Sequence, residues 1–426
     1  MLHHSRASCV IGCPQMTRIA RLVWPATFFV LATSSRAEAP PPAMAGPSAA
    51  EQEFVARHWR RPISPQGPPP ARFSPIERSL QPEACGACHP VQFGDWQDSI
   101  HARSMGPGIA GQLVDMIKSD PASARSCATC HAPIAEQQPD LVEGGHVIAN
   151  PDFDPALQSR GVLCASCHVR EHQRFGPPRR DGSTASRGPR HRLPHNGLTR
   201  TTAFLRSEFC ASCHQFAPDG PTLAGKPLEN TYEEWRGSPA ARRGLQCQSC
   251  HMPDRRHLWR GIHDADMVRS GLDIVLRAGR PRYRPGDLAR ATFMITTPRV
   301  GHAFPTYVTP AVIVRAELID SAGRAVPDSL EERIIGRQVP LDLSREIADT
   351  RIPPGGRFRL DYARRLETTG LRLRVIVTVL PDEFYTRFFG AMLAAGAGAG
   401  EEQIRLALEA TRRSAYTLYE KDLPLN

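Results

Sequence analysis

The distribution of apolar and polar positions along the 426-residue chain changes near residue 270. Beyond that point, short runs recur that alternate apolar with polar residues or are rich in β-branched residues. Turn signals separate the runs, among them the Pro-Gly pairs at 285–286 and 354–355. Such runs predict an antiparallel β-sandwich domain over residues 269–382. The expected strands cover 273–277, 288–297, 311–319, 333–339, 358–362 and 371–379.

A helical pattern follows the expected strands. Residues 383–393 predict a short helix, and the Ala and Gly residues at 394–400 predict a flexible link. Apolar residues at helical spacing, with two Glu residues at the start, predict a longer helix over 401–421. We therefore expect residues 383–426 to form a C-terminal helical segment.

The first 37 residues have the organisation of a Sec-type secretory signal peptide. They contain four Arg and no acidic residue, an apolar run at 22–33, and small residues at Ser35 and Ala37. An uncleaved anchor is the alternative. The Pro- and Ala-rich stretch that follows predicts a linker over 38–78. No stretch reaches the roughly 18 to 20 apolar residues of a spanning helix, which excludes a polytopic membrane protein.

Ten of the 12 Cys residues belong to five copies of Cys-x-x-Cys-His. This is the attachment signature of c-type haem. Two thiols at this spacing bond to the two vinyl groups of one haem, and the adjacent imidazole becomes the proximal iron ligand. The sequence therefore predicts five covalent haems c. The thiols are those of Cys85, Cys88, Cys127, Cys130, Cys164, Cys167, Cys210, Cys213, Cys247 and Cys250, and the proximal ligands are His89, His131, His168, His214 and His251.

Zinc sites and structural disulfides are the alternatives, but neither requires a His after every second Cys. The motifs begin 42, 37, 46 and 37 residues apart, which leaves little chain for a separate apolar core. We therefore expect an α plus irregular domain over 79–268 in which the haems form the core. Crowding alone then brings the haems close enough for electron transfer between them.

A second axial ligand suits a haem to electron transfer, whereas a vacant sixth position favours ligand binding or catalysis. After residue 37 the chain has nine histidines outside the motifs, enough for every haem to be bis-His. The alternative for each is an ordinary hydrogen-bonding histidine on a loop or surface. His58, His146, His172 and His191 are the weaker candidates. The stronger distal candidates are His101, His195, His257, His263 and His302.

The haem segment resembles multihaem c-type cytochromes of the cytochrome c-554/c-prime family. The resemblance rests on the first motif with Trp96, Ser99 and His101 after it, and on the third motif preceded by Gly161. The fifth motif continues as Met-Pro, and residues 301–306 look like a stretch of larger multihaem cytochromes with a β domain. The resemblance implies periplasmic electron carriers, with nitrogen- and sulfur-compound oxidoreductases among related folds. Five motifs and an added β domain depart from the four-haem pattern, and no Cys-x-x-Cys-Lys of the pentahaem nitrite reductases is present.

These observations predict a periplasmic protein that passes electrons along five haems and has no catalytic residue. A multihaem oxidoreductase acting on a small nitrogen or sulfur compound at a five-coordinate haem is the alternative, and a structural or docking subunit of a redox complex is the second. Redox proteins are the expected partners, either a quinol-oxidising membrane complex or other periplasmic cytochromes.

The net charge of +10 first suggests nucleic acid as a partner. Without residues 1–37 the charge falls to +6, and haem propionates would offset most of the remainder. We therefore expect no nucleic-acid partner.

Overall fold

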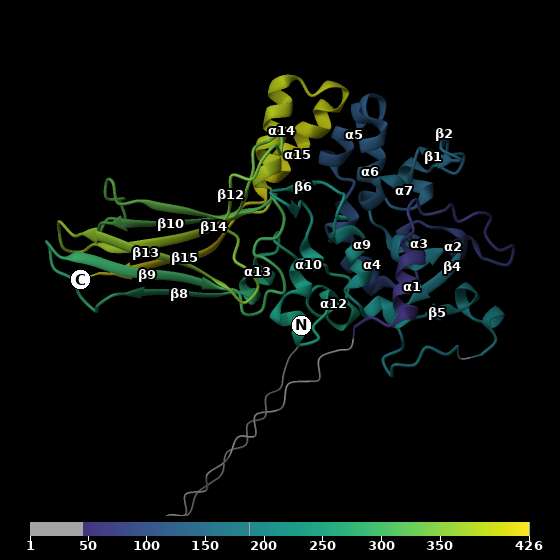
Figure 1. The fold of residues 1–426 in the computed structure, drawn as a ribbon, viewed down its shortest axis with the longest axis horizontal. Helices are drawn as coiled ribbons and strands as arrows, with labels where there is room; N and C mark the ends of the chain where they lie inside the picture. Colours follow the sequence, from purple (N-terminus) through teal and green to yellow (C-terminus); the bar gives the residue numbers. More distant parts are fainter. Residues whose placement is uncertain (1–45, 187, 426) are drawn as a thin grey trace, which may run out of the picture. The chain divides into compact units, whose positions relative to one another are not determined.

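Two antiparallel sheets form the β-rich region of the chain in this computed structural model, which describes residues 46–186 and 188–425 (Figure 1). One sheet has the strand order β12-β11-β10-β14-β15 and the other the order β13-β9-β8. The strands are β8 (Asp273–Ala278), β9 (Leu288–Thr296), β10 (Ala311–Ile319), β11 (Glu331–Gln338), β12 (Ala348–Asp349), β13 (Arg357–Arg365), β14 (Arg372–Leu380) and β15 (Tyr416–Pro424).

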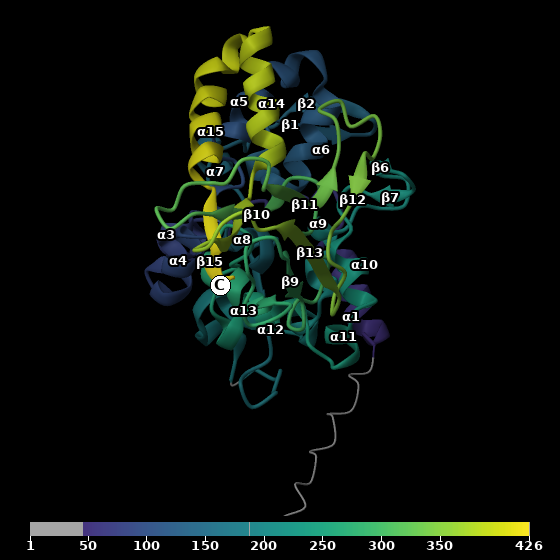
Figure 2. The same cartoon turned by 90° about the vertical axis from the view of Figure 1, so that its left-hand side faces the viewer.

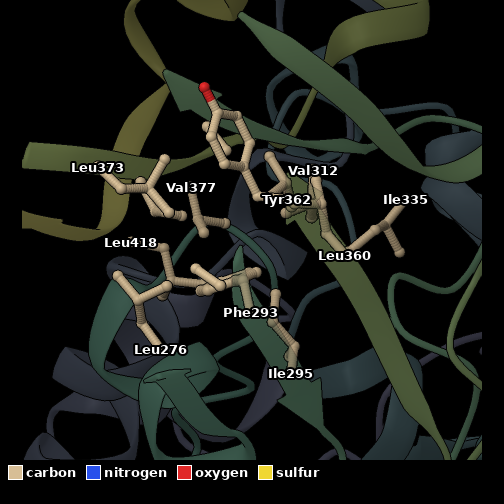
Figure 3. Close-up of a cluster of buried hydrophobic side chains, with 14 of the residues drawn as sticks. Leu276, Phe293, Ile295, Val312, Ile335, Leu360, Tyr362, Leu373, Val377 and Leu418 are labelled. Atoms are coloured by element: carbon tan, nitrogen blue, oxygen red, sulfur yellow. The ribbon is translucent and has the colours of Figure 1, made fainter. Parts of the chain in front are cut away.

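Each of the six expected strands appears near its predicted position, because one face of each sheet is apolar. In β14 the side chains of Leu373, Val375, Val377 and Val379 alternate with more exposed ones, and each is at most 1% exposed. Side chains of both sheets meet in one buried cluster, which includes Phe293 from β9 (Figure 3). The period of two therefore predicted both the strands and their buried faces.

The helix expected over 401–421 is shorter in the structure. It ends at Arg413, and the chain continues as strand β15, which pairs antiparallel with β14. An ion pair between Arg374 and Asp422, 2.8 Å long, lies across these strands, and Leu418 enters the core. The open edge of β14 offers backbone partners that local helical spacing cannot reveal, and the aromatic residues of 416–419 suit a strand.

Helices α14 (Glu383–Ala395) and α15 (Glu401–Arg413) form a hairpin beside α5 (Pro107–Ser119), as Figures 1 and 2 show. Ile404 and Phe389 are buried between them. A Cβ at Gly108 would lie 2.7 Å from Phe389 Cζ, so α5 approaches at a position where only glycine fits without a shift. The hairpin thus fastens the segment after the strands to the first half of the chain.

The region that carries the cysteine motifs consists of short helices and small sheets joined by long loops. Its sheets are β1-β2, β3-β4-β5 and β6-β7. Its strands are β1 (Asp140–Glu143), β2 (His146–Ala149), β3 (Val169–Arg170), β4 (Gln173–Gly176), β5 (Leu198–Arg200), β6 (Thr222–Leu223) and β7 (Lys226–Pro227). Its helices, α5 aside, are α2 (Pro75–Arg78), α3 (Pro82–Gly86), α4 (Pro90–Gln97), α6 (Pro121–His131), α7 (Pro155–Gln158), α8 (Cys164–His168), α9 (Glu208–His214), α10 (Thr231–Arg236), α11 (Pro239–Arg242), α12 (Cys247–His251) and α13 (Ala265–Gly271).

The segment expected to be a linker differs from that expectation in its described part, residues 46–78. It contains helix α1 (Ala49–His58), which starts with a capping box between Ser48 and Glu51. Phe54 and Trp59 are buried in a cluster with residues of α4, α8 and α9. Its high Pro content reflects an irregular path between these anchor points, and the aromatic residues make the segment part of the folded body.

The described residues, 46–186 and 188–425, belong to one compact unit that spans both expected domains. The border predicted between residues 268 and 269 stays a prediction, and the predicted signal peptide, 1–37, lies outside the described residues. Within the described ranges, no helix has both the length and the apolar character needed to cross a bilayer.

Candidate haem-binding site

All five Cys-x-x-Cys-His motifs lie on or beside a helical turn. Four of the motif histidines are the last residues of α6, α8, α9 and α12, and His89 directly precedes α4. A helical turn puts the two cysteines and the histidine of a motif on adjacent positions of one short surface. The ten motif cysteines are free thiols in the structure and form no disulfide.

Three of the motif histidines face a second histidine that lies outside the motifs. The ring centres of His214 and His101 are 6.2 Å apart, and those of His168 and His257 are also 6.2 Å apart. The rings of His251 and His302 are 6.3 Å apart and nearly parallel, with 11° between their planes. The partners come from the 3-10 turn at His101–Arg103, from the loop after α12 and from the loop before β10.

This separation fits two imidazoles on one metal. A histidine–metal bond is about 2 Å long and the bonding nitrogen lies about 1 Å from its ring centre, so two such rings on opposite sides have centres roughly 6 Å apart. Rings packed directly against each other would lie closer, as His101 does to Trp259 at 4.6 Å. The residues present therefore fit a group with an iron at its centre, held between each pair.

The other ring nitrogen of most motif histidines is already engaged. Nδ1 of His131, His168 and His251 lies 2.7, 2.8 and 2.7 Å from a backbone carbonyl oxygen, that of Ser104, Phe175 and Arg260 respectively. A carbonyl only accepts, so Nδ1–H donates and Nε2 is left as the bare, metal-binding nitrogen. His214 differs, because its Nδ1 lies 2.8 Å from the hydroxyl of Tyr307.

Burial keeps these imidazoles in the form that binds metal. It lowers the pKa of His101 to about 3, and the pKa of both His168 and His214 to about 4. A neutral imidazole binds metal, whereas an imidazolium cannot. At neutral pH the rings are thus ready to coordinate.

Two of the predicted distal histidines do not face a motif histidine in this way. His263 places Nε2 3.0 Å from Asp382 Oδ2. His195 donates its backbone N–H to Glu77, and its Nδ1 is buried without a hydrogen-bond partner. Correspondingly, in residues 46–186 and 188–425 no histidine ring pairs in this way with His89 or with His131.

The thiols of different motifs meet in pairs. Side-chain contacts join Cys85 with Cys164, Cys130 with Cys213, and Cys210 with Cys247. The guanidinium of Arg61 donates to both Cys130 Sγ and Cys213 Sγ at 3.0 Å. Among the described residues, three or more His, Cys, Asp or Glu side chains never converge as in a closed zinc site. The attachment positions of the first and third, the second and fourth, and the fourth and fifth motifs therefore lie side by side.

Several residues of the site carry no sequence signal of their own. Trp259 packs against both His101 and His257, and Asp95 accepts from the His257 backbone N–H and from Arg256. Tyr307 comes from the loop that also carries His302. Trp259 and Tyr307 were not predicted, and the one sequence signal that could have found them is their nearness in sequence to His257 and His302. The contacts of Asp95 and Arg61 join distant parts of the chain, so motif spacing could not predict them.

Comparison with known families gives one match. The family described as cytochrome c554 and c-prime matches residues 84–169, the part of the chain that contains the first three motifs. No curated protein matches the chain.

Among solved structures, the chain is similar to a penta-heme cytochrome c552 from Thermochromatium tepidum. The two are 17% identical, the match covers 83% of this chain and 100% of that chain, and the TM-score is 0.58. At this identity the likeness is one of fold. The sporulation control protein Spo0M from Bacillus subtilis aligns over 26% of this chain and 43% of its own at 10% identity, with a TM-score of 0.14 that carries no argument.

Proposed function

We propose that this protein, a multihaem c-type cytochrome by its family match and its fold, transfers electrons through five covalently bound haems. The observation that carries the proposal is the set of three histidine pairs, each beside a Cys-x-x-Cys-His motif and each spaced for one iron. When bound, haem supplies a one-electron Fe(III)/Fe(II) couple. Two imidazoles on one iron leave no position for a substrate, which suits a carrier.

In this proposal the chain supplies the proximal ligand of all five haems and the distal ligand of four, and the sixth position of the haem on His131 is where the carrier and the second candidate below differ. The ten motif thiols hold the haems, and the five motif imidazoles are the proximal ligands. His101, His257 and His302 are the distal ligands opposite His214, His168 and His251. For His89 we propose His195, because its buried Nδ1 has no hydrogen-bond partner, with only Glu77 Oε1 3.9 Å away, and its charge interacts with that of His89.

The pairing of thiols supports electron transfer between haems. Contacts between cysteines connect the first motif with the third, the second with the fourth, and the fourth with the fifth. Cys167 of the third motif also interacts electrostatically with Cys210 and Cys213 of the fourth. The attachment edges of the five haems would then form one connected set in which the fourth haem has three neighbours.

The cellular setting belongs to the same proposal. Covalent haem attachment occurs outside the cytoplasm, so we propose a periplasmic protein exported by the segment 1–37. Its donors and acceptors are then redox proteins, either a quinol-oxidising membrane complex or other periplasmic cytochromes. The two sheets with one shared core fit a β-sandwich that serves as a docking module within a redox complex.

One observation favours a second candidate function, the oxidation or reduction of a small nitrogen or sulfur compound at a five-coordinate haem. His263 engages Asp382, and no histidine ring within residues 46–186 and 188–425 faces His131. The haem of the second motif is therefore the one at which such a reaction would occur.

Electron paramagnetic resonance of the oxidised protein separates the two. We expect low-spin signals that account for all five haems, counted independently as the pyridine haemochrome. A stoichiometric high-spin haem would contradict a pure carrier and support the second candidate. His101→Ala, His257→Ala and His302→Ala should each convert one low-spin haem to high spin, whereas His146→Ala, at an exposed position in β2, should change no signal.

A further inference from the structure

The loop between β9 and β10 carries Tyr307, whose hydroxyl lies against Nδ1 of the motif histidine His214. Three other motif histidines have a backbone carbonyl at this position and donate Nδ1–H to it, but His214 donates it to the hydroxyl of Tyr307 at 2.8 Å. We propose that the Tyr307 hydroxyl sets the reduction potential of the haem held by His214 apart from the potentials of the other haems. The inference rests on the proposed function, because it requires haem on His214.

The position of Tyr307 is fixed by its own loop. The backbone N–H of Ala303 and the hydroxyl of Thr306 both donate to Glu234 Oε2, at 3.1 and 3.2 Å. Glu234 is in turn held by Arg351 at 2.8 Å, and both side chains are buried. Tyr307 itself has a left-handed φ of 65°, a conformation that a non-glycine residue keeps only where its surroundings hold it. The hydroxyl is therefore held toward Nδ1 by a network of the surrounding loop and α10.

The side chains around the Tyr307 hydroxyl leave it a modest hydrogen-bond acceptor. It contacts the side chains of Glu229 and Thr231. Burial raises the pKa of Glu229 to about 8, so at pH 7 this carboxyl is mostly neutral, and the charge of the nearby Glu234 is offset by its ion pair with Arg351. A phenol oxygen accepts more weakly than an amide carbonyl, so the His214 imidazole keeps more of its Nδ1 proton density.

The strength of this hydrogen bond acts on the iron through the imidazole. A strong acceptor on Nδ1 makes the ring a better electron donor and stabilises Fe(III). With the weaker acceptor, Fe(III) is stabilised less, and the haem of His214 takes an electron more readily than its neighbours. A bound haem would supply the one-electron Fe(III)/Fe(II) couple, and the role of His214 is to keep its Nδ1 proton toward the Tyr307 hydroxyl in both states.

The test is a potentiometric titration of the holoprotein at pH 7, followed by visible and electron paramagnetic resonance spectra. Tyr307→Phe removes the acceptor with little change in shape, so we expect the midpoint potential of one haem to rise and the other four to stay unchanged. The shifted haem should be the one whose low-spin signal His101→Ala converts to high spin. An unchanged set of potentials, or an equal shift of all five, would overturn the inference.

Tyr362→Phe is the matched control. It also removes a buried phenolic hydrogen bond, of 2.7 Å to the Ser329 carbonyl, but within the sheets and away from every motif histidine. We expect it to move none of the five potentials. If Tyr307→Phe does not assemble with five haems, replacing all tyrosines by 3-fluorotyrosine weakens the same acceptor in the unchanged sequence and should shift the same haem upward. High-spin haem in the unaltered protein would contradict the proposed function, whereas low-spin signals with unmoved potentials would contradict this inference alone.

Discussion

Glu51 is a buried carboxylate on α1, only 6% exposed, and it joins the start of the described chain to the haem-binding region. Arg206 Nε donates to it at 3.1 Å and the Ser48 backbone N–H at 2.7 Å. Burial by itself would raise the pKa of Glu51, but hydrogen bonds from Thr202, Ser48 and Arg206 outweigh burial and lower this pKa to about 2. A carboxyl whose folded pKa lies below its unfolded value, about 4.3, stabilises the fold above that value and loses this contribution as the pH falls toward 2.

We therefore expect Glu51→Gln to destabilise the protein at pH 7 by about 1.5 to 3 kcal/mol, the range for a hydrogen bond to a charged group. The difference between the variant and the original protein should shrink as the pH falls from about 5 toward 2. Urea unfolding at a series of pH values, followed by tryptophan fluorescence, measures it. Glu53→Gln, at an exposed position on the same helix, should show neither effect. A difference that does not depend on pH would exclude the ion pair as its source.

Single residues also show what local sequence can and cannot predict about the site. The Cys-x-x-Cys-His spacing identified every motif, and the family described as cytochrome c554 and c-prime matches the residues that contain the first three. His101, His257 and His302 were predicted as distal ligands, but their partners were not, because pairing depends on contacts between distant parts of the chain. Tyr307 was missed for the same reason, since it lies 93 residues from His214.

At the scale of elements, α5 packs on the α14–α15 hairpin at two glycines. A Cβ at Gly108 would lie 2.7 Å from Phe389 Cζ, and one at Gly111 would lie 2.9 Å from Gln403 Cβ. Phe389 is buried, so its ring has little room to retreat. In contrast, a Cβ at Gly390 within α14 would meet nothing within 4 Å.

Gly108→Ala should therefore destabilise the protein by about 1 to 3 kcal/mol through overpacking, despite the better helix propensity of alanine. Gly390→Ala should instead stabilise it by about 0.5 to 1 kcal/mol, because only the propensity changes. The thermal midpoints of the two variants, measured by circular dichroism, should shift in opposite directions. Shifts of the same sign would show that the close contact at Gly108 is not what limits the packing.

Two further elements show why sequence patterns predicted some of the fold and missed the rest. Strands β8 to β11, β13 and β14 follow a local period of two, so their positions were predictable, whereas the two-residue strand β12 was not predicted. Strand β15 was predicted as helix, because Leu418 fits a helical spacing and its true partner, β14, is distant in sequence. Helix α1 lies in a segment whose Pro-rich composition predicts a linker, and its fixed position comes from Phe54 and from Trp59 just after it, which pack on residues far along the chain.

For the whole molecule, the proposed five haems make it a store of five electrons. Each one-electron reduction lowers the net charge by one, so the protein becomes more negative as electrons are added. The starting charge is the +6 of residues 38–426 plus the charges of the haem irons and propionates. Later electrons therefore enter against a growing repulsion, which spreads the potentials of similar haems over a range.

A reductive titration with dithionite should consume five electrons per chain, with the chain concentration taken from quantitative amino-acid analysis. The absorbance change should extend over a wider range of potential than a single one-electron curve. Raising the ionic strength should narrow this range for haems near the surface, because salt screens the repulsion. Four electrons or fewer per chain would contradict a fully occupied set of motifs.

The loop that carries His302 and Tyr307 has a consequence for how the protein matures. Both residues follow all five attachment motifs in the chain, so a chain exported from its N-terminus would present its thiols before His302 and before Tyr307, the hydrogen-bond partner of His214. Covalent attachment and final ligation are thereby separated in time. In the proposed function, His251 alone would hold the fifth haem until β9 and β10 fold around the loop and bring His302 to the same site. The β region would thus complete the ligands of the fifth haem, through His302, and add the Tyr307 hydrogen bond to His214, only after all five motifs have been delivered.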